Sequence, residues 1–121
     1  MTRIFSLFLV LLLAACATAQ PGPEAFGSAE RAIASAEAAG ADEHAPVEMR
    51  FAREKLDEAR LGVERRQYDV AFYLIEQAEI NAELAIVKSR AAQLRREVNE
   101  ARRSNEVLGE ELRETFGEVL E

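Results

Sequence analysis

Few side chains in this 121-residue sequence are suited to covalent chemistry, and cysteine and histidine each occur only once. Cys16 follows an apolar run over residues 4–13 that only Ser6 interrupts, and two small residues, Ala14 and Ala15, stand directly before it. A lone thiol cannot close an intramolecular disulfide. Its place at the end of an apolar leader therefore favours a covalent modification of the sulfur.

The apolar leader has the length of a secretory signal. It is shorter than the roughly 20 residues that span a bilayer, and it suits a signal-peptide core of about 7–15 residues, with Arg3 supplying the preceding positive charge. Leu13-Ala14-Ala15-Cys16 resembles the bacterial lipobox, in which the cysteine receives a diacylglycerol thioether and becomes the new N-terminus. This resemblance implies a lipoprotein signal peptide over residues 1–15 and a lipidated tether over residues 16–23.

Two other readings of the leader stay open. Ala17-Thr18-Ala19 also fits ordinary signal peptidase, which would release a soluble periplasmic protein, and an uncleaved leader would act as an anchor. On the lipoprotein reading, Ala17 bears on the destination, because an Asp after the cysteine commonly retains Gram-negative lipoproteins in the inner membrane. We therefore expect attachment through Cys16 to the periplasmic face of the outer membrane.

The remaining polar residues do not predict an active site. His44 lies beside Asp42 and Glu43, but a zinc site needs three or four converging ligands, so we interpret His44 as a solvated turn residue. No serine or threonine has a positioned base. We interpret five further carboxylates as solvated helix faces, because nothing predicts a pocket around them: Glu76, Glu79, Glu83, Glu110 and Glu111. The sequence predicts a non-enzymatic protein without a metal, cofactor or small-molecule substrate.

The net charge makes some classes of binding partner unfavourable. The net charge is −7, from 22 acidic and 15 basic residues. Nucleic acid is a poor partner because it requires a basic patch, and an acidic protein is discouraged from lying flat on anionic lipid. Arg95-Arg96 and Arg102-Arg103 form a short basic repeat, which Glu100 and Glu106 partly neutralise from i,i+4 positions.

The apolar pattern of residues 24–68 predicts two short helices. The first, over residues 24–39, has small apolar residues at helical spacing and ends at Gly40, which can adopt the left-handed conformation. The second begins at Pro46 as its first helical residue, with Glu48 able to supply half of a capping interaction. Its apolar stripe contains Met49, Ala52, Leu56, Ala59 and Val63.

Residues 69–121 predict one long helix with Asp69 as its N-cap. One face of this helix is expected to pack on the two shorter helices: Ala71, Leu74, Ile75, Ala78, Ala82 and Ala85. A second face begins at Ile80 and steps alternately by four and three residues, which is the heptad repeat of a coiled coil. The fold class is therefore all-α: a helical hairpin packed on a long C-terminal helix that is coiled-coil-like from residue 80.

The heptad face is the predicted interface. Its a positions are Leu84, Ala91, Val98, Asn105, Leu112 and Val119, and its d positions are Ile80, Val87, Leu94, Ala101, Leu108 and Thr115. We expect Leu94, Val98, Asn105, Leu108 and Leu112 to contact a second copy or a partner helix, or to fold back on the hairpin. A polar Asn105 at a favours two parallel strands. Across such a pair Glu83–Lys88 and Glu97–Arg102 attract, whereas Arg90–Arg95 repel.

Residues 25–85 resemble an uncharacterised Gram-negative lipoprotein family, alanine-rich and helical, known only as a domain of unknown function and sometimes fused to an OmpA-like domain. The matching residues are Gly40-Ala41, Ala45-Pro46, Glu48, Ala52, Lys55-Leu56, Ala59, Tyr68, Ala71, Leu74, Gln77-Ala78-Glu79 and Ala82-Glu83-Leu84-Ala85. The resemblance implies a helical fold and an envelope location, and it implies no catalytic residue or ligand.

Two functions follow as expectations. The first is a structural or scaffold lipoprotein of the cell envelope that acts by helix–helix interaction. The second is a peptide- or protein-binding adaptor of tetratricopeptide-like helical type, because Tyr68-Asp69 and Ala71 resemble the turn of one such hairpin. The adaptor would use the aromatic residues Tyr68, Phe72 and Tyr73, and it requires these rings to be exposed.

Overall fold

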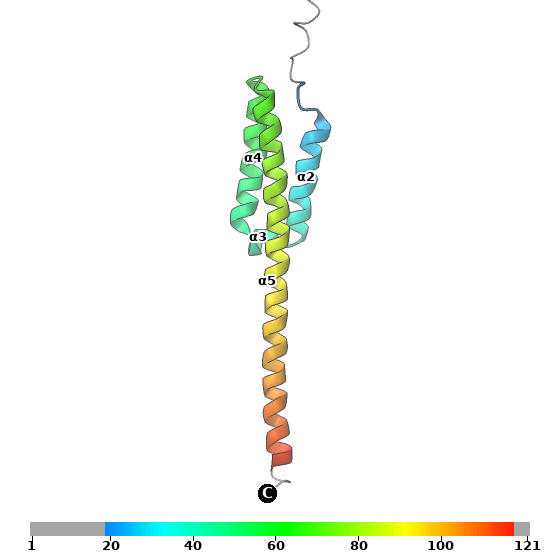
Figure 1. Cartoon of the computed structure of the whole chain (residues 1–121), viewed down its shortest axis with the longest axis vertical. Helices are drawn as coiled ribbons and strands as arrows, with labels where there is room; N and C mark the ends of the chain where they lie inside the picture. Colours follow the sequence, from blue (N-terminus) through cyan, green and yellow to red (C-terminus); the bar gives the residue numbers. More distant parts are fainter. Residues whose placement is uncertain (1–18, 118–121) are drawn as a thin grey trace, which may run out of the picture.

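The computed structural model describes residues 19–117, and every regular element in that range is a helix. The helices are α2 (Pro23–Ala38), α3 (Ala41–His44), α4 (Pro46–Glu64) and α5 (Tyr68–Gly117). Helices α2 and α4 flank the first half of α5, and α5 continues alone beyond them (Figure 1). The predicted all-α hairpin on a long helix is confirmed. The leader, the lipobox Leu13-Ala14-Ala15, Cys16 and Val119 lie outside the described residues.

Helix α2 begins and ends where its backbone chemistry allows. Pro23, which the sequence assigned to the tether, is instead the first helical residue, because a proline at N1 needs no hydrogen-bond acceptor for its nitrogen. The helix stops at Gly40, whose φ of 72° and ψ of 27° are left-handed, and the Gly40 N–H donates to the Glu37 carbonyl at 2.9 Å. The predicted glycine stop is confirmed.

The connection between α2 and α4 contains a helical turn that the sequence did not predict. In α3 the N–H groups of Glu43 and His44 both donate to the Gly40 carbonyl at 3.2 Å. The turn buries Ala41 and Ala45 against the other helices. Four residues are too few to show a helical period, so the apolar pattern could not reveal this element.

Helix α4 starts at Pro46 as predicted and is buried along Met49, Ala52, Leu56 and Ala59. At its end Gly62 is buried, whereas the predicted Val63 is only half-buried. A Cβ on Gly62 would lie 3.3 Å from the Ala71 Cβ of α5, so the glycine lets the two helices approach closely at this end.

The turn from α4 to α5 is a Schellman motif with arginine at its left-handed position. Arg66 has a φ of 59°. The Arg66 N–H donates to the Val63 carbonyl at 3.0 Å, and the Gln67 N–H donates to the Gly62 carbonyl at 2.8 Å. Helix α5 then begins at Tyr68, so Asp69 lies in its first turn and is not the N-cap that the sequence predicted. The acidic side chain still suits the positive end of the helix.

Small side chains form the core between these helices. The buried stripe of α5 contains Ala71, Ile75, Ala78, Ala82, Ala85 and Ser89. Leu74 from the predicted stripe is half-buried. Ala29 and Ala36 of α2 and Ala52 and Ala59 of α4 are fully buried against this core. Within residues 19–117, no helix is long and apolar enough to cross a membrane.

Replacing Gly40 by alanine tests the left-handed stop. The new methyl group would be strained at a φ of 72° and would lie 3.4 Å from the Gln93 Nε2. We expect Gly40→Ala to lower the free energy of unfolding by about 1–2 kcal/mol, measured by urea denaturation followed by circular dichroism. Gly109→Ala is the matched control, because nothing lies within 4 Å of its added Cβ. Equal stability of the two variants would contradict this account.

Candidate functional site

Helix α5 carries two apolar faces that point in opposite directions. Each residue turns an α-helix by about 100°, so Ile80 lies about 200° around the axis from the buried Ala78. We call the second face the α5 seam and define it by its ten described a and d positions from Ile80 to Leu112: Ile80, Leu84, Val87, Ala91, Leu94, Val98, Ala101, Asn105, Leu108 and Leu112. The large apolar side chains of the seam are between 43% and 63% exposed.

Four of the five predicted interface residues lie beyond Arg96, where α5 continues past the hairpin, and Leu94 lies just before it. Leu94, Val98, Asn105, Leu108 and Leu112 are all exposed. The seam faces solvent and does not fold back on the hairpin. Residues 97–117 extend about 30 Å at 1.5 Å per residue. A single helix with regularly exposed Leu and Val side chains has the surface of a coiled-coil strand that lacks its partner.

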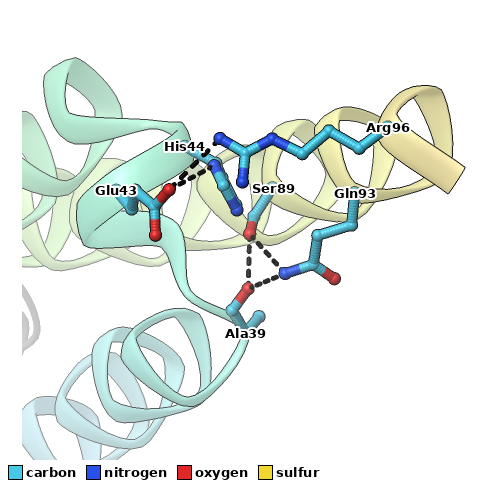
Figure 2. A network of polar contacts seen from close by, with 6 residues as sticks. All are labelled: Ala39, Glu43, His44, Ser89, Gln93 and Arg96. Atoms are coloured by element: carbon cyan, nitrogen blue, oxygen red, sulfur yellow. Dashed lines mark hydrogen bonds and ion pairs between the residues drawn. The ribbon is translucent and has the colours of Figure 1, made fainter. Parts of the chain in front are cut away.

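A polar cluster fixes the hairpin end to α5 at the point where the free part of the helix begins. Ser89 donates its hydroxyl to the Ala39 carbonyl, and Gln93 donates its amide to the same carbonyl at 3.0 Å (Figure 2). Ala39 is the C-cap of α2, where carbonyls lack helical partners. Ser89 is fully buried, so its hydroxyl needs this bond.

His44 belongs to the same cluster, and the prediction that it is solvated is wrong. Its side chain is 9% exposed because α3 turns it toward α5, and its Nδ1 lies 3.9 Å from Glu43 Oε1 (Figure 2). Arg96 of α5 reaches the same Glu43 oxygen at 3.2 Å, in place of the predicted i,i+4 pair with Glu100. Within residues 19–117, no group of three or more histidine, cysteine or acidic residues could hold a metal ion.

Ion pairs also tie the short helices to each other and to α5. Arg53 of α4 contacts Glu37 of α2 at 2.6 Å and Asp42 of α3 at 2.9 Å. Arg60 contacts Glu30 of α2 at 2.8 Å. These side chains are about half exposed, so each pair contributes little stability by itself, and the pairs mainly fix the register of the hairpin.

Lys88 has an intrachain partner that the sequence did not predict. Its ammonium binds the carboxylate of Glu48, whose side chain is only 12% exposed. The hydrogen bond from Lys88, with a backbone hydrogen bond at Glu48, holds the pKa of the Glu48 carboxyl below its ordinary value. Glu48 therefore does not cap Ala45, whose N–H already donates to the Ala41 carbonyl at 2.8 Å.

The aromatic residues at the start of α5 do not form one patch. Tyr73 is 60% exposed, Phe72 is 41% exposed and Tyr68 is half-buried. Because neighbouring helix residues are about 100° apart, Phe72 and Tyr73 point to different sides. The adaptor hypothesis requires exposed aromatic rings. Phe72 and Tyr73 are exposed, but they lie on two separate surfaces.

A groove lies between α2 and α4. Ile33, Ala34 and Leu56 form its floor, and the pairs of Arg53 and Arg60 cross it; its volume is about 270 Å³. None of the five carboxylates considered from the sequence lines this groove, and four of them are exposed. The groove offers no charged group without a partner to orient a reaction.

The helices of this chain match a known protein family. A family model described as a domain of unknown function, DUF4398, matches residues 24–101. The chain belongs to the DUF4398 family. The DUF4398 match covers the hairpin apart from Pro23 and continues along α5 as far as Ala101, so it includes the first seven seam positions. No curated protein and no solved structure matches the chain significantly.

The DUF4398 assignment confirms that the chain belongs to a family known only as a domain of unknown function, and the match extends past residue 85. What sequence reasoning missed is the cluster of Ser89, Gln93 and His44. A signal was present for Ser89, because it continues the alternating steps of four and three that run from Ala71 to Ala85. Its polarity concealed its membership of the buried face.

Removing the Ser89 hydroxyl tests the polar cluster. We expect Ser89→Ala to lower the free energy of unfolding by about 1 kcal/mol, because the Ala39 carbonyl keeps only Gln93 as a side-chain donor. Ser104→Ala, at an exposed position of the same helix, should leave it unchanged or slightly raised. Urea denaturation of both variants measures the difference. An equal effect of the two changes would show that the buried bond adds no stability.

The Glu48–Lys88 pair predicts a specific pH dependence. Since the folded-state pKa of Glu48 lies below its ordinary value of 4.5, the pair stabilises the fold fully above that value, and this stability is lost as pH falls through the folded pKa. Lys88→Met should therefore destabilise the protein near neutral pH and cost less on acidification. Urea denaturation of the Lys88→Met variant and of the parent, near neutral pH and at acidic pH, measures this difference in stability. Arg113→Met, at an exposed position of α5, is the control; a constant difference across pH would contradict the pair's role.

Proposed function

We propose that this DUF4398 chain is a structural or scaffold lipoprotein of the cell envelope, anchored in the outer membrane and facing the periplasm, which acts by helix–helix interaction. The observation that carries the proposal is the exposed α5 seam. Its large apolar side chains continue for about 48 Å from Ile80 to Leu112 on one helix. A surface of this kind is stable in water when another helix covers it.

The direction of the helices supports an anchored role. The described chain begins at the end of the bundle that lies farthest from the tip of α5 (Figure 1). The segment between Cys16 and Pro23 can span at most about 25 Å. A lipid on Cys16 would therefore keep the hairpin close to the membrane and direct the free half of α5 away from it.

The lipobox supports the choice of anchor and membrane. Leu13-Ala14-Ala15-Cys16 is the modification motif, and Ala17 lacks the acidic side chain that commonly retains such proteins in the inner membrane. Two or three acyl chains would give durable attachment, whereas one chain binds only marginally. The proposal assigns no catalytic step, cofactor or nucleic-acid contact to the chain.

A second candidate is an adaptor that binds a peptide or protein through exposed aromatic rings. The exposure of Tyr73 favours it. It ranks second because Tyr73 and Phe72 point to different sides, whereas the seam residues share one face over most of α5. Tyr73→Ala would weaken an adaptor and leave contacts through the seam unchanged.

Replacing Cys16 by serine tests the anchor. We expect the parent protein to incorporate labelled fatty acid and to fractionate with outer membranes, and Cys16→Ser to lose the label and remain as the longer precursor. Thr18→Ser, two residues on, is the matched control and should behave as the parent. If Cys16→Ser is still processed and appears in the soluble periplasmic fraction, cleavage at Ala17-Thr18-Ala19 is correct and the lipid anchor is wrong.

A further inference from the structure

The charges beside the α5 seam differ between its two flanks. In the heptad register of the seam, the e positions on one flank carry the cations Lys88, Arg95 and Arg102. The g positions on the other flank carry Glu83, Arg90, Glu97, Ser104 and Glu111. One flank is therefore basic, and the other carries three glutamates, the neutral Ser104 and one cation, Arg90.

This division selects an orientation for a second copy of the chain. In a parallel pair of helices each e position meets a g position of the partner, so the basic flank lies against the acidic flank. In an antiparallel pair e meets e, which would bring the cations of both copies together. Parallel pairing also lets Asn105 meet its own counterpart at an a position, which fixes the register.

We propose that the α5 seam from Ile80 to Leu112 pairs with the same seam of a second copy, in parallel and in register. This inference rests on the proposed helix–helix function and names its partner. Pairing leaves the hairpin intact, because the seam lies on the face of α5 opposite its buried stripe. In a parallel pair both copies begin at the same end, as anchorage in one membrane requires.

The pairing is expected to be weak in free solution and stronger on the membrane. Ala91, Ala101 and Asn105 contribute little buried apolar area to the seam. Lys88 is already bound to Glu48, so Glu97–Arg102 is the best attraction between copies, while Arg90–Arg95 opposes pairing. Two anchored copies share a thin layer, which raises their effective concentration without any new contact.

Engineered cysteines at two d positions test direction and register in whole cells. Cys16 is the only native cysteine, and acylation would remove its thiol. In full-length chains of two tag sizes, Leu94→Cys should form disulfides with Leu94→Cys, and Leu108→Cys with Leu108→Cys. Leu94→Cys with Leu108→Cys should form none, because in a parallel pair the two positions are about 21 Å apart along the axis. Arg103→Cys, on the outer f position, is the control and should not crosslink.

Each other result overturns the inference in a different way. A mixed 94–108 disulfide would mean an antiparallel pair. Absence of disulfides together with a photocrosslink from position 108 to a different protein would replace the second copy by another partner and leave the proposed function intact. Absence of any crosslink from the seam would contradict both the pairing of two copies and the proposed helix–helix function. The anchor is tested separately by Cys16→Ser.

A charge change tests the contact between flanks without disturbing the fold. Arg90→Glu turns the two repulsive Arg90–Arg95 contacts of the pair into attractions and should increase the 108–108 disulfide about threefold or more. Arg103→Glu makes the same change in charge on the outer face and should leave the yield within experimental error of the parent. An equal response of the two variants, or a fall with Arg90→Glu, would overturn the parallel arrangement.

Discussion

The fold depends on how closely three helices can approach α5. Most residues of its buried stripe are alanines. Near the N-terminus of α5, Gly62 lies so close to Ala71 that an added Cβ would be 3.3 Å from the Ala71 Cβ. Small side chains bury little area each, so the core gains stability mainly from many close contacts along its length. Ile75 is the one large apolar residue of this buried stripe, and most other large apolar side chains of α5 are exposed on its remaining faces.

The order of the helices and some of their boundaries could be read from the sequence, and other local details could not. Pro46 and Gly40 predict helix boundaries because each has a single strong backbone property. Asp69 did not, because an acidic residue suits both the N-cap and the first helical turn. The environment of His44 was missed because it depends on α3, an element too short to produce a pattern. That of Ser89 was missed because its polarity concealed its place on the buried stripe of α5.

Sequence spacing also predicts which residues share a face of α5, but it does not predict the ion pairs between helices. Spacing along α5 predicted that the seam residues share a face, and they do. Spacing could not predict that Lys88 binds Glu48, because 40 residues separate them and α4 brings them together only once the hairpin has formed. Arg96 likewise reaches Glu43 in α3 and leaves its neighbour Glu100. Both cations add contacts between the hairpin and α5 to those that Ser89 and Gln93 make with Ala39.

That junction explains how a helix can continue so far without a neighbour. Starting a helix is costly because several residues must be ordered for the first hydrogen bond, whereas each further residue adds one bond. The hairpin orders the first half of α5 through its core and through Ser89 and Gln93, so the free half only has to extend an existing helix. Extension alone leaves residues 97–117 marginally stable. The hairpin thus acts as the nucleus that keeps the seam on one continuous surface, and a partner that covers the seam would supply the stability that the free half lacks.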